Sequence, residues 1–166
     1  MVLLSIIIGL GLAEILRGVA RHIRNRDSVS GYWVHSVAVC LVFVALLQQW
    51  WEIWGLHSSP DWSFLGLLMM LTGPIGLVLI SYLLFPQPVR GADYREYYYR
   101  PMRPVLWIAV LTVTLATLFR PIDFGEELFK IDNASSFIGF DGFAVLALSR
   151  NRIIHAVLVP ALFVAI

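Results

Sequence analysis

Long apolar stretches alternate with short polar connections along the whole chain. A helix needs about 20 apolar residues to cross about 30 Å of hydrocarbon, so such stretches predict transmembrane helices. Four of them cover residues 2–20, 32–54, 62–85 and 104–119. Two further stretches, at residues 132–149 and 153–166, predict a fifth helix and a sixth of only 14 residues. The pattern therefore predicts an all-α, polytopic transmembrane helix bundle of about six helices.

Aromatic residues and prolines mark the ends of the predicted helices. Trp33 lies at the start of the second apolar stretch and Trp54 at its end, as expected for rings in the two headgroup layers. Pro86 stops the third helix and Pro104 opens the fourth. The sixth helix reaches only about 21 Å at 1.5 Å per residue. Either it thins the bilayer locally or the natural chain continues.

Composition places the whole chain in a membrane. The 166 residues are 59% hydrophobic and 14% charged, with a mean hydropathy of +0.79. Soluble domains average about 45–50% apolar and about 25% charged residues. The bilayer is the expected partner, and residues 1–166 form a single transmembrane domain. A net charge of +1 gives no indication of nucleic-acid binding.

Basic residues are concentrated in alternate connections between the predicted helices. Ten of the twelve arginines and lysines lie in the first, third and fifth connections, and only Arg120 and Lys130 lie in the others. The positive-inside rule places arginine-rich connections in the cytoplasm. We therefore expect a multi-pass protein of the inner membrane with both termini outside the cytoplasm.

Four polar residues in the predicted spans are candidates for a polar route. Asp141 lies roughly 14 Å inside the fifth helix at about 1.5 Å per residue, where a lone carboxylate protonates or needs a partner. A proton- or cation-coupled role, a hydrogen-bonded packing role and an outer re-entrant turn all stay open. Glu14 either pairs with Arg17 or faces a cytoplasmic vestibule. Gln48 and Glu52, spaced i and i+4, either line a mouth or cross-link helices.

The arginine-rich connections are candidates for contacts with headgroups or a partner. Tyr94, Arg95 and Arg100 belong to a run of tyrosines interleaved with arginines, which can bind phosphate or lipid headgroups. The alternative is an interfacial helix that its rings anchor. Arg17 and Arg21 offer similar contacts at the first connection.

Two histidines are the candidates for binding a cofactor. His35 and His155 each lie about three residues inside the predicted cytoplasmic edge of a helix, so they could ligate a haem. The alternative is a pair of buried histidines with hydrogen-bond partners. We expect neither a metal nor another cofactor. No nucleophile–base pair or nucleotide-binding loop is visible, which disfavours an enzyme.

Small residues form a stripe along the first helix. Ser5, Gly9 and Ala13 are spaced i, i+4 and i+8, so a neighbouring helix can approach their side closely. The stripe indicates either packing within the monomer or a subunit interface.

Four segments carry a resemblance to other proteins. They are Gly9-Leu-Gly-Leu-Ala-Glu-Ile-Leu-Arg-Gly18, Gln49-Trp-Trp51, Tyr97-Tyr-Tyr-Arg100 and Ser149-Arg-Asn-Arg152. Together they resemble a group of small, uncharacterised bacterial membrane proteins. The resemblance implies an inner-membrane location and a chain that stops soon after the last hairpin. It implies no activity and no functional residues.

These observations lead to three functional hypotheses. The first is an oligomeric channel or transporter-like protein, with the polar residues along its route. The second is a non-catalytic accessory, sensory or scaffold subunit that docks a partner membrane subunit through its basic connections. The third is a bis-histidine haem redox protein.

Overall fold

In a computed structural model of the chain, the residues described are 2–28, 30–55, 64–85, 93–99, 102–124, 134–149 and 151–165. These residues form helices and contain no strand, which confirms the predicted all-α class. The elements are α1 (Val2–Arg24), η1 (Arg26–Ser28), α2 (Trp33–Gly55), α3 (Phe64–Leu83), α4 (Tyr94–Tyr99), α5 (Met102–Phe124), α6 (Ala134–Leu148) and α7 (Arg152–Ala165).

The described residues of each of the six apolar stretches are mainly helical, and the largest difference from the prediction is at the end of the fourth stretch. The sequence predicts that this helix ends before Arg120, but α5 continues through Pro121 to Phe124. A proline removes one backbone hydrogen bond, and membrane helices tolerate this where neighbouring groups satisfy the carbonyl that is left free. The first helix also extends beyond its apolar stretch, to Arg24.

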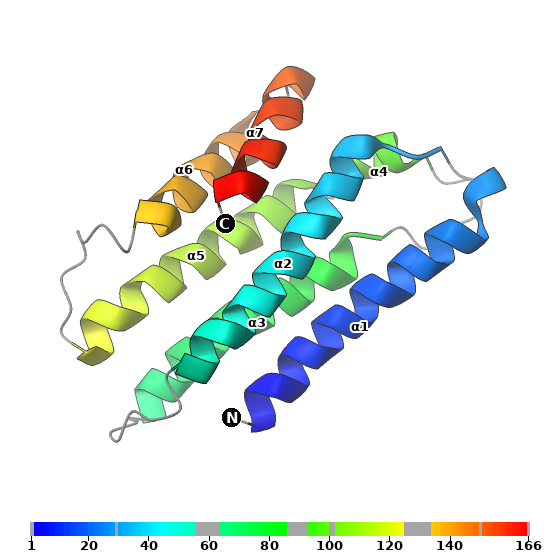
Figure 1. The fold of residues 1–166 in the computed structure, drawn as a ribbon. Helices are drawn as coiled ribbons and strands as arrows, with labels where there is room; N and C mark the ends of the chain where they lie inside the picture. Colours follow the sequence, from blue (N-terminus) through cyan, green and yellow to red (C-terminus); the bar gives the residue numbers. More distant parts are fainter. Residues whose placement is uncertain are drawn as a thin grey trace.

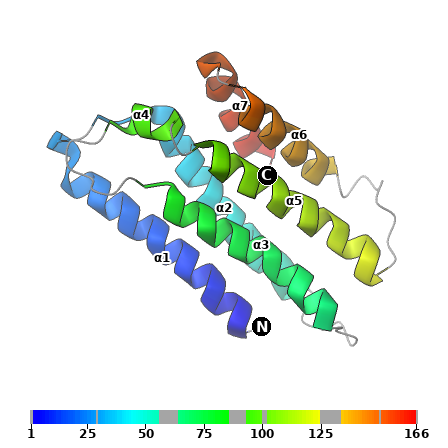
Figure 2. The ribbon, with the colours of Figure 1, turned by 180° about the vertical axis from the view of Figure 1, so that it is seen from behind.

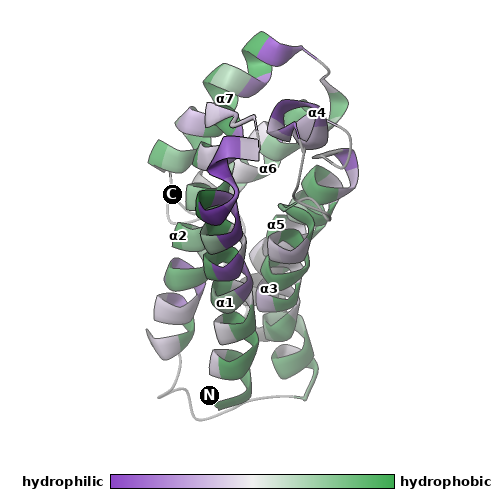
Figure 3. Ribbon diagram, turned by 90° about the vertical axis from the view of Figure 1, so that its right-hand side faces the viewer, coloured by the Kyte–Doolittle hydropathy of each residue, from purple (hydrophilic) through white to green (hydrophobic). Residues whose placement is uncertain are grey.

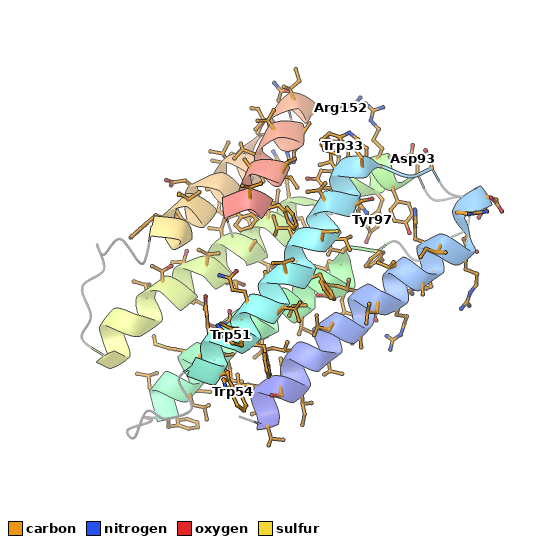
Figure 4. All side chains as sticks on the ribbon, viewed as in Figure 1. Trp33, Trp51, Trp54, Asp93, Tyr97 and Arg152 are labelled. Carbon is orange, nitrogen blue, oxygen red and sulfur yellow. The ribbon has the colours of Figure 1, made fainter. Side chains whose placement is uncertain are left out.

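The helices α1, α2 and α3 are long and apolar enough to cross a membrane. Along α2, Trp33 and Trp54 are 21 residues apart, or about 30 Å at 1.5 Å per residue, which matches the thickness of a bilayer core. Both indole rings are more than half exposed and lie near opposite ends of the bundle (Figure 4). Large apolar side chains are exposed along the helices, and hydrophilic residues gather on the last turns of α1 and on α4 (Figure 3). The chain is therefore a membrane protein.

The helices form a bundle in which α2 and α7 cover one side of a row. The row runs α1, α3, α5, α6, and each helix contacts the next; α2 packs on α1 and α3, and α7 packs on α2 and α6 (Figures 1 and 2). The short helix α4 lies at one end of the bundle, which we call the α4 end. The N-terminus lies at the opposite end, whereas α7 ends part-way along the bundle (Figure 1).

Glycines allow the helices of the row to approach closely. A Cβ atom on Gly18 of α1 would overlap the ring of Phe85, and one on Gly76 of α3 would overlap Oγ1 of Thr112 on α5. Close approach increases dispersion contacts, which stabilise helix pairs where lipid weakens the hydrophobic driving force. The row α1–α3–α5 therefore depends on these two glycines.

The α4 end is fixed by backbone hydrogen bonds between distant segments. The backbone N–H of Tyr94 donates to the carbonyl of Ser30 across 3.1 Å, which ties the start of α4 to the segment before α2. Asp93 caps α4, because its Oδ1 accepts a hydrogen bond from the N–H of Arg95 at 2.8 Å. This short helix is thus held against the ends of α2 and α5.

Candidate functional site

Five helices line a half-open cavity of about 230 Å³, which we call the ring cavity. They are α2, α3, α5, α6 and α7, and each packs on the next, with α7 closing the ring on α2. A stripe of α2 from Ala38 to Glu52 faces the cavity, a length of about 21 Å at 1.5 Å per residue. Most of its wall is apolar, with contributions such as Leu41, Phe143 and Val159.

The polar lining of the ring cavity lies mainly in the half away from α4. Gln48, Gln49 and Glu52 of α2 and Thr112 of α5 supply it. The Gln48 amide donates to the Glu52 carboxylate across 3.4 Å. The oxygen Oε1 of Gln49 lies 2.8 Å from the place of a Cβ on Gly73, so the absence of a side chain there lets this amide lie across α3. The cavity therefore combines an apolar body with hydrogen-bonding groups near one end.

At the α4 end, the ring cavity is bounded by Tyr98 and His155. Tyr98 lines the cavity, and its hydroxyl donates to Nδ1 of His155 across 3.3 Å. The other ring nitrogen of His155, Nε2, donates to the carbonyl of Ser149 at 3.1 Å. Both side chains are buried. The carbonyl of Ser149 can only accept, so Nε2 carries a proton, and in the Nε2–H tautomer Nδ1 accepts from Tyr98.

A second, open pocket of about 700 Å³ lies beyond this pair, and we call it the arginine pocket. Three arginines line it: Arg95 of α4, Arg103 of α5 and Arg152 of α7. The guanidinium of Arg152 lies 5.9 Å from the ring centre of Tyr99, within range of a cation–π interaction. Two buried leucines, Leu106 and Leu146, line both the arginine pocket and the ring cavity.

Burial keeps the tyrosines of α4 protonated. It raises the pKa of Tyr98, and the neighbouring Tyr99 and Tyr32 add to the effect. Burial also raises the pKa of Tyr99 to about 12, and the hydrogen bond between the hydroxyls of Tyr99 and Tyr32 supports the same direction. Both hydroxyls therefore remain donors throughout the physiological pH range.

Comparison of the chain with protein-family models, curated proteins and solved structures finds no match.

The four candidates for a polar route divide between the cavity and other surfaces. Gln48 and Glu52 line the ring cavity together. Glu14 lies buried on α1, where it accepts hydrogen bonds from Arg17 and, at 2.7 Å, from Arg21. Asp141 is exposed on α6. Among the residues that the structure describes, neither Glu14 nor Asp141 lines the cavity.

Both candidate haem ligands have hydrogen-bond partners within the protein. Nε2 of His35 lies 2.6 Å from the carbonyl of Leu84, and the ring packs edge-on against Phe85 and Tyr94. His155 uses both ring nitrogens, as described above. The geometry thus favours buried histidines that stabilise the α4 end. In the described part of the chain, no three His, Cys, Asp or Glu side chains are grouped closely enough to hold a metal ion.

The basic and tyrosine candidates lie on two sides of the α4 end. Tyr94 is almost fully buried, with His22 and His35 packed edge-on against its ring, so it has a structural place beside Arg21. Arg95 lines the arginine pocket, and Arg17 is held by Glu14. Arg100 lies outside the described residues.

The sequence predicts no role in a site for Gln49, Arg103 and Arg152, which line the two spaces. Tyr98 belongs to the run of tyrosines and arginines that is a candidate for headgroup contacts, and it lines the ring cavity. The sequence also favours hydrogen bonds from Thr112, Thr114 and Thr117 to their own helix, and Thr114 and Thr117 do donate to the carbonyls of Val110 and Val113 respectively. Thr112 instead lies against Gly76 of the neighbouring helix, and a single sequence gives no indication of this helix pairing.

Proposed function

We propose that this chain is a small transporter-like protein of a bacterial inner membrane, and that its solute binds in the ring cavity. The observation that carries the proposal is the cavity between the helices. Five helices line an elongated, half-open and mainly apolar space with polar groups near one end. Solute sites in membrane bundles are built in this way, between helices and away from lipid.

The proposed topology has six membrane-spanning helices, with α4 at the cytoplasmic surface. Its support is the distribution of arginines, because the described ones at the connections before α2, before α5 and before α7, such as Arg24, Arg103 and Arg152, lie at the α4 end. The arginine pocket is then the cytoplasmic side of the site, and Gln48 and Glu52 approach the outer side. Both chain termini lie outside the cytoplasm.

The proposed assembly is a homo-oligomer in the membrane. Ser5, Gly9 and Ala13 are all exposed on α1, and a Cβ on Gly9 would meet nothing within 4 Å. Packing within the monomer therefore does not use this stripe. A second copy fits such a surface because small residues allow two helices to approach closely. Asp141, exposed in the middle of α6 beside exposed Ile138 and Phe140, marks another surface that a neighbouring subunit would shield from lipid.

Flux measurements in proteoliposomes test the transport proposal. The purified chain is reconstituted into liposomes, and uptake of protons, monovalent cations and a panel of small amphiphiles is compared with protein-free liposomes. We expect uptake of at least one class. The variant Ala45→Leu, which fills the ring cavity, is expected to lower that uptake at least tenfold.

A matched variant separates blockage from general damage. Ala161→Leu makes the same change on an exposed position of α7 that does not line the ring cavity, and it should leave the uptake unaltered. Absence of uptake for every class would overturn the proposal. So would equal uptake by Ala45→Leu and the parent chain. A polar variant, Glu52→Gln, tests whether the carboxylate takes part, with proton or cation uptake as the readout.

A further inference from the structure

We propose that the ligand of this site is an amphiphile with a phosphate-type headgroup. The headgroup binds in the arginine pocket, and the apolar tail extends past Tyr98 and His155 into the ring cavity. The proposal rests on the proposed function in one respect, that the ring cavity is a binding site. It adds the chemical class of the ligand and its orientation.

The arginine pocket has the donors that a phosphate group requires. Arg95, Arg103 and Arg152 come from three different helices and line one open space. A guanidinium offers a planar fork of N–H donors, which matches the oxygen atoms of phosphate. In the part of the chain that the structure describes, no carboxylate forms an ion pair with any of these three side chains. Their hydrogen-bonding capacity is therefore available to a ligand.

The charge of the pocket limits what the headgroup can be. Among the described residues that line this space, three arginines stand beside two carboxylates, Asp93 and Glu96. Asp93 is engaged in capping α4 through its Oδ1. A small anionic group can contact the arginines alone, whereas a polyanion such as a nucleic acid would also meet the two carboxylates. The geometry thus favours one phosphate monoester or diester.

The apolar tail has a continuous wall to follow. Leu106 and Leu146 line both spaces, and both are almost fully buried. An engineered cavity of about 150 Å³ with aliphatic and aromatic walls stays dry and binds benzene. The ring cavity, at about 230 Å³, is larger and similarly lined, so it can hold a hydrocarbon group.

The Tyr98–His155 pair separates the two parts of the ligand site. Tyr98 lines the ring cavity and His155 lines the arginine pocket. The tail reaches the cavity when the hydroxyl of Tyr98 leaves Nδ1 of His155. The freed hydroxyl is then a donor beside the headgroup, and it is protonated because burial raises its pKa.

Binding of alkyl phosphates to the full chain tests this proposal. The protein is placed in nanodiscs of zwitterionic lipid, and binding of inorganic phosphate, butyl phosphate and dodecyl phosphate is measured by calorimetry, with empty nanodiscs subtracted. An uncharged dodecyl glycoside serves as the neutral amphiphile. We expect dodecyl phosphate to bind at least tenfold more tightly than butyl phosphate, inorganic phosphate or the glycoside.

Variants test whether the headgroup binds in the arginine pocket and the tail in the ring cavity. Arg103→Gln and Arg152→Gln should each weaken dodecyl phosphate binding about tenfold or more, while Arg24→Gln, the same charge change at an exposed position of α1, should not. Ala45→Leu should remove the advantage of the dodecyl chain, and Ala161→Leu, at an exposed position of α7 outside both spaces, should keep it. Circular dichroism confirms that each variant is helical.

Three results would overturn the proposal. They are equal binding of dodecyl phosphate and the glycoside, equal binding of dodecyl phosphate and inorganic phosphate, and arginine variants that bind like the parent chain. The source of the ligand is resolved by a second arm. Phosphatidic acid in the nanodisc competes if the ligand is a membrane lipid, and a water-soluble phosphate ester competes if it comes from the cytoplasm.

The outcome also separates this proposal from the transport proposal. Tight binding of dodecyl phosphate without any flux would support the ligand proposal and overturn the transport proposal. Flux without phosphate-dependent binding would support transport of another solute and overturn the ligand proposal.

Discussion

The hydroxyl of Tyr98 donates a hydrogen bond to Nδ1 of His155 across 3.3 Å, at the boundary between the ring cavity and the arginine pocket. Tyr98→Phe removes the donor and keeps the ring. Because the imidazole nitrogen then lacks a partner in a buried place, we expect a loss of about 1–3 kcal/mol in the free energy of unfolding. We also expect faster association of dodecyl phosphate, measured by stopped-flow fluorescence with a labelled alkyl phosphate.

Tyr97→Phe is the matched control for this change. The hydroxyl of Tyr97 donates to the carbonyls of Leu83, at 2.8 Å, and Phe85, at 3.1 Å, and Tyr97 does not line either space. This variant should lose stability without faster association. If both variants associate at the same rate as the parent chain, the Tyr98–His155 pair does not control access to the cavity.

The contact between Gly76 and Thr112 gives a prediction about packing. A Cβ on Gly76 would lie 2.9 Å from Cβ of Thr112 and would overlap its Oγ1, so α3 and α5 would have to separate. We expect Gly76→Ala to cost about 1–3 kcal/mol, the usual range for overpacking. Thermal unfolding in mild detergent measures this loss of stability.

Gly9→Ala provides the opposite expectation on another helix. A Cβ at Gly9 would meet nothing within 4 Å, and alanine favours a helix by about 1 kcal/mol relative to glycine. The monomer in detergent should therefore become slightly more stable.

A double variant tests the Gly76 contact itself. Adding Thr112→Ala to Gly76→Ala should recover part of the lost stability, since Oγ1 and one methyl group are removed. A double variant as unstable as Gly76→Ala alone would place the strain elsewhere.

Glu14 provides a prediction that separates a structural role from a role in transport. Its carboxylate is buried and accepts from both Arg17 and Arg21, so Glu14→Gln leaves two guanidinium groups poorly paired. Breaking a buried pair costs about 3–5 kcal/mol. The side chain of Arg17 is 62% exposed and water compensates part of the loss, so we expect about 1–3 kcal/mol.

The control for Glu14 is an ion pair on the surface of the same end. Asp27 pairs with Arg26 at 3.7 Å, and both side chains are exposed, so Asp27→Asn should leave the unfolding temperature unchanged. Glu14 does not line the ring cavity, and any flux should persist in Glu14→Gln once loss of folded protein is corrected. Loss of flux in fully folded protein would make Glu14 part of the route.

Three carboxylates, Glu14, Glu52 and Asp141, show which parts of the structure the sequence can predict. The spacing of Glu14 and Arg17, three residues apart on one helix, predicted their ion pair, and the structure confirms it. Gln48 and Glu52 lie on the same side of α2 for the same reason. The spacing of residues along the chain therefore predicts the helices and the side-chain contacts within one helix.

The spacing of residues along the helix does not predict that Asp141 is exposed. The stretch around it is apolar on every side, with exposed Ile138 and Phe140 and a cavity-lining Phe143, so the pattern does not indicate which side packs inward. That side is determined by α5 and α7, the neighbours of α6. The ring cavity and the arginine pocket depend on the same long-range pairing, since each takes its residues from several helices.

The tyrosines of α4 predict how stability depends on pH. The pKa of Tyr99 is raised to about 12 from the ordinary value of 10, so the unfolded chain loses this proton at lower pH than the folded chain. The contribution of Tyr99 to stability is thus fully present below pH 10 and is lost as pH rises toward 12. Unfolding in detergent between pH 9 and 12 should show this decline, and Tyr99→Phe should make it shallower. A decline of equal slope in both proteins would contradict the assignment to Tyr99.

The exposed stripe on α1 leads to the prediction about assembly. If a second copy packs there, Gly9 lies close to its counterpart, because a symmetric helix pair brings the small residues of both copies together. In a Cys40→Ser background, Gly9→Cys should form a disulfide-linked dimer in native membranes under mild oxidation. Leu10→Cys is the matched control: it is also exposed, but it lies about 100° around the helix from Gly9, since the helix has 3.6 residues per turn. Equal cross-linking at both positions would indicate random collision, and no cross-linking at Gly9→Cys would rule out an assembly through this stripe.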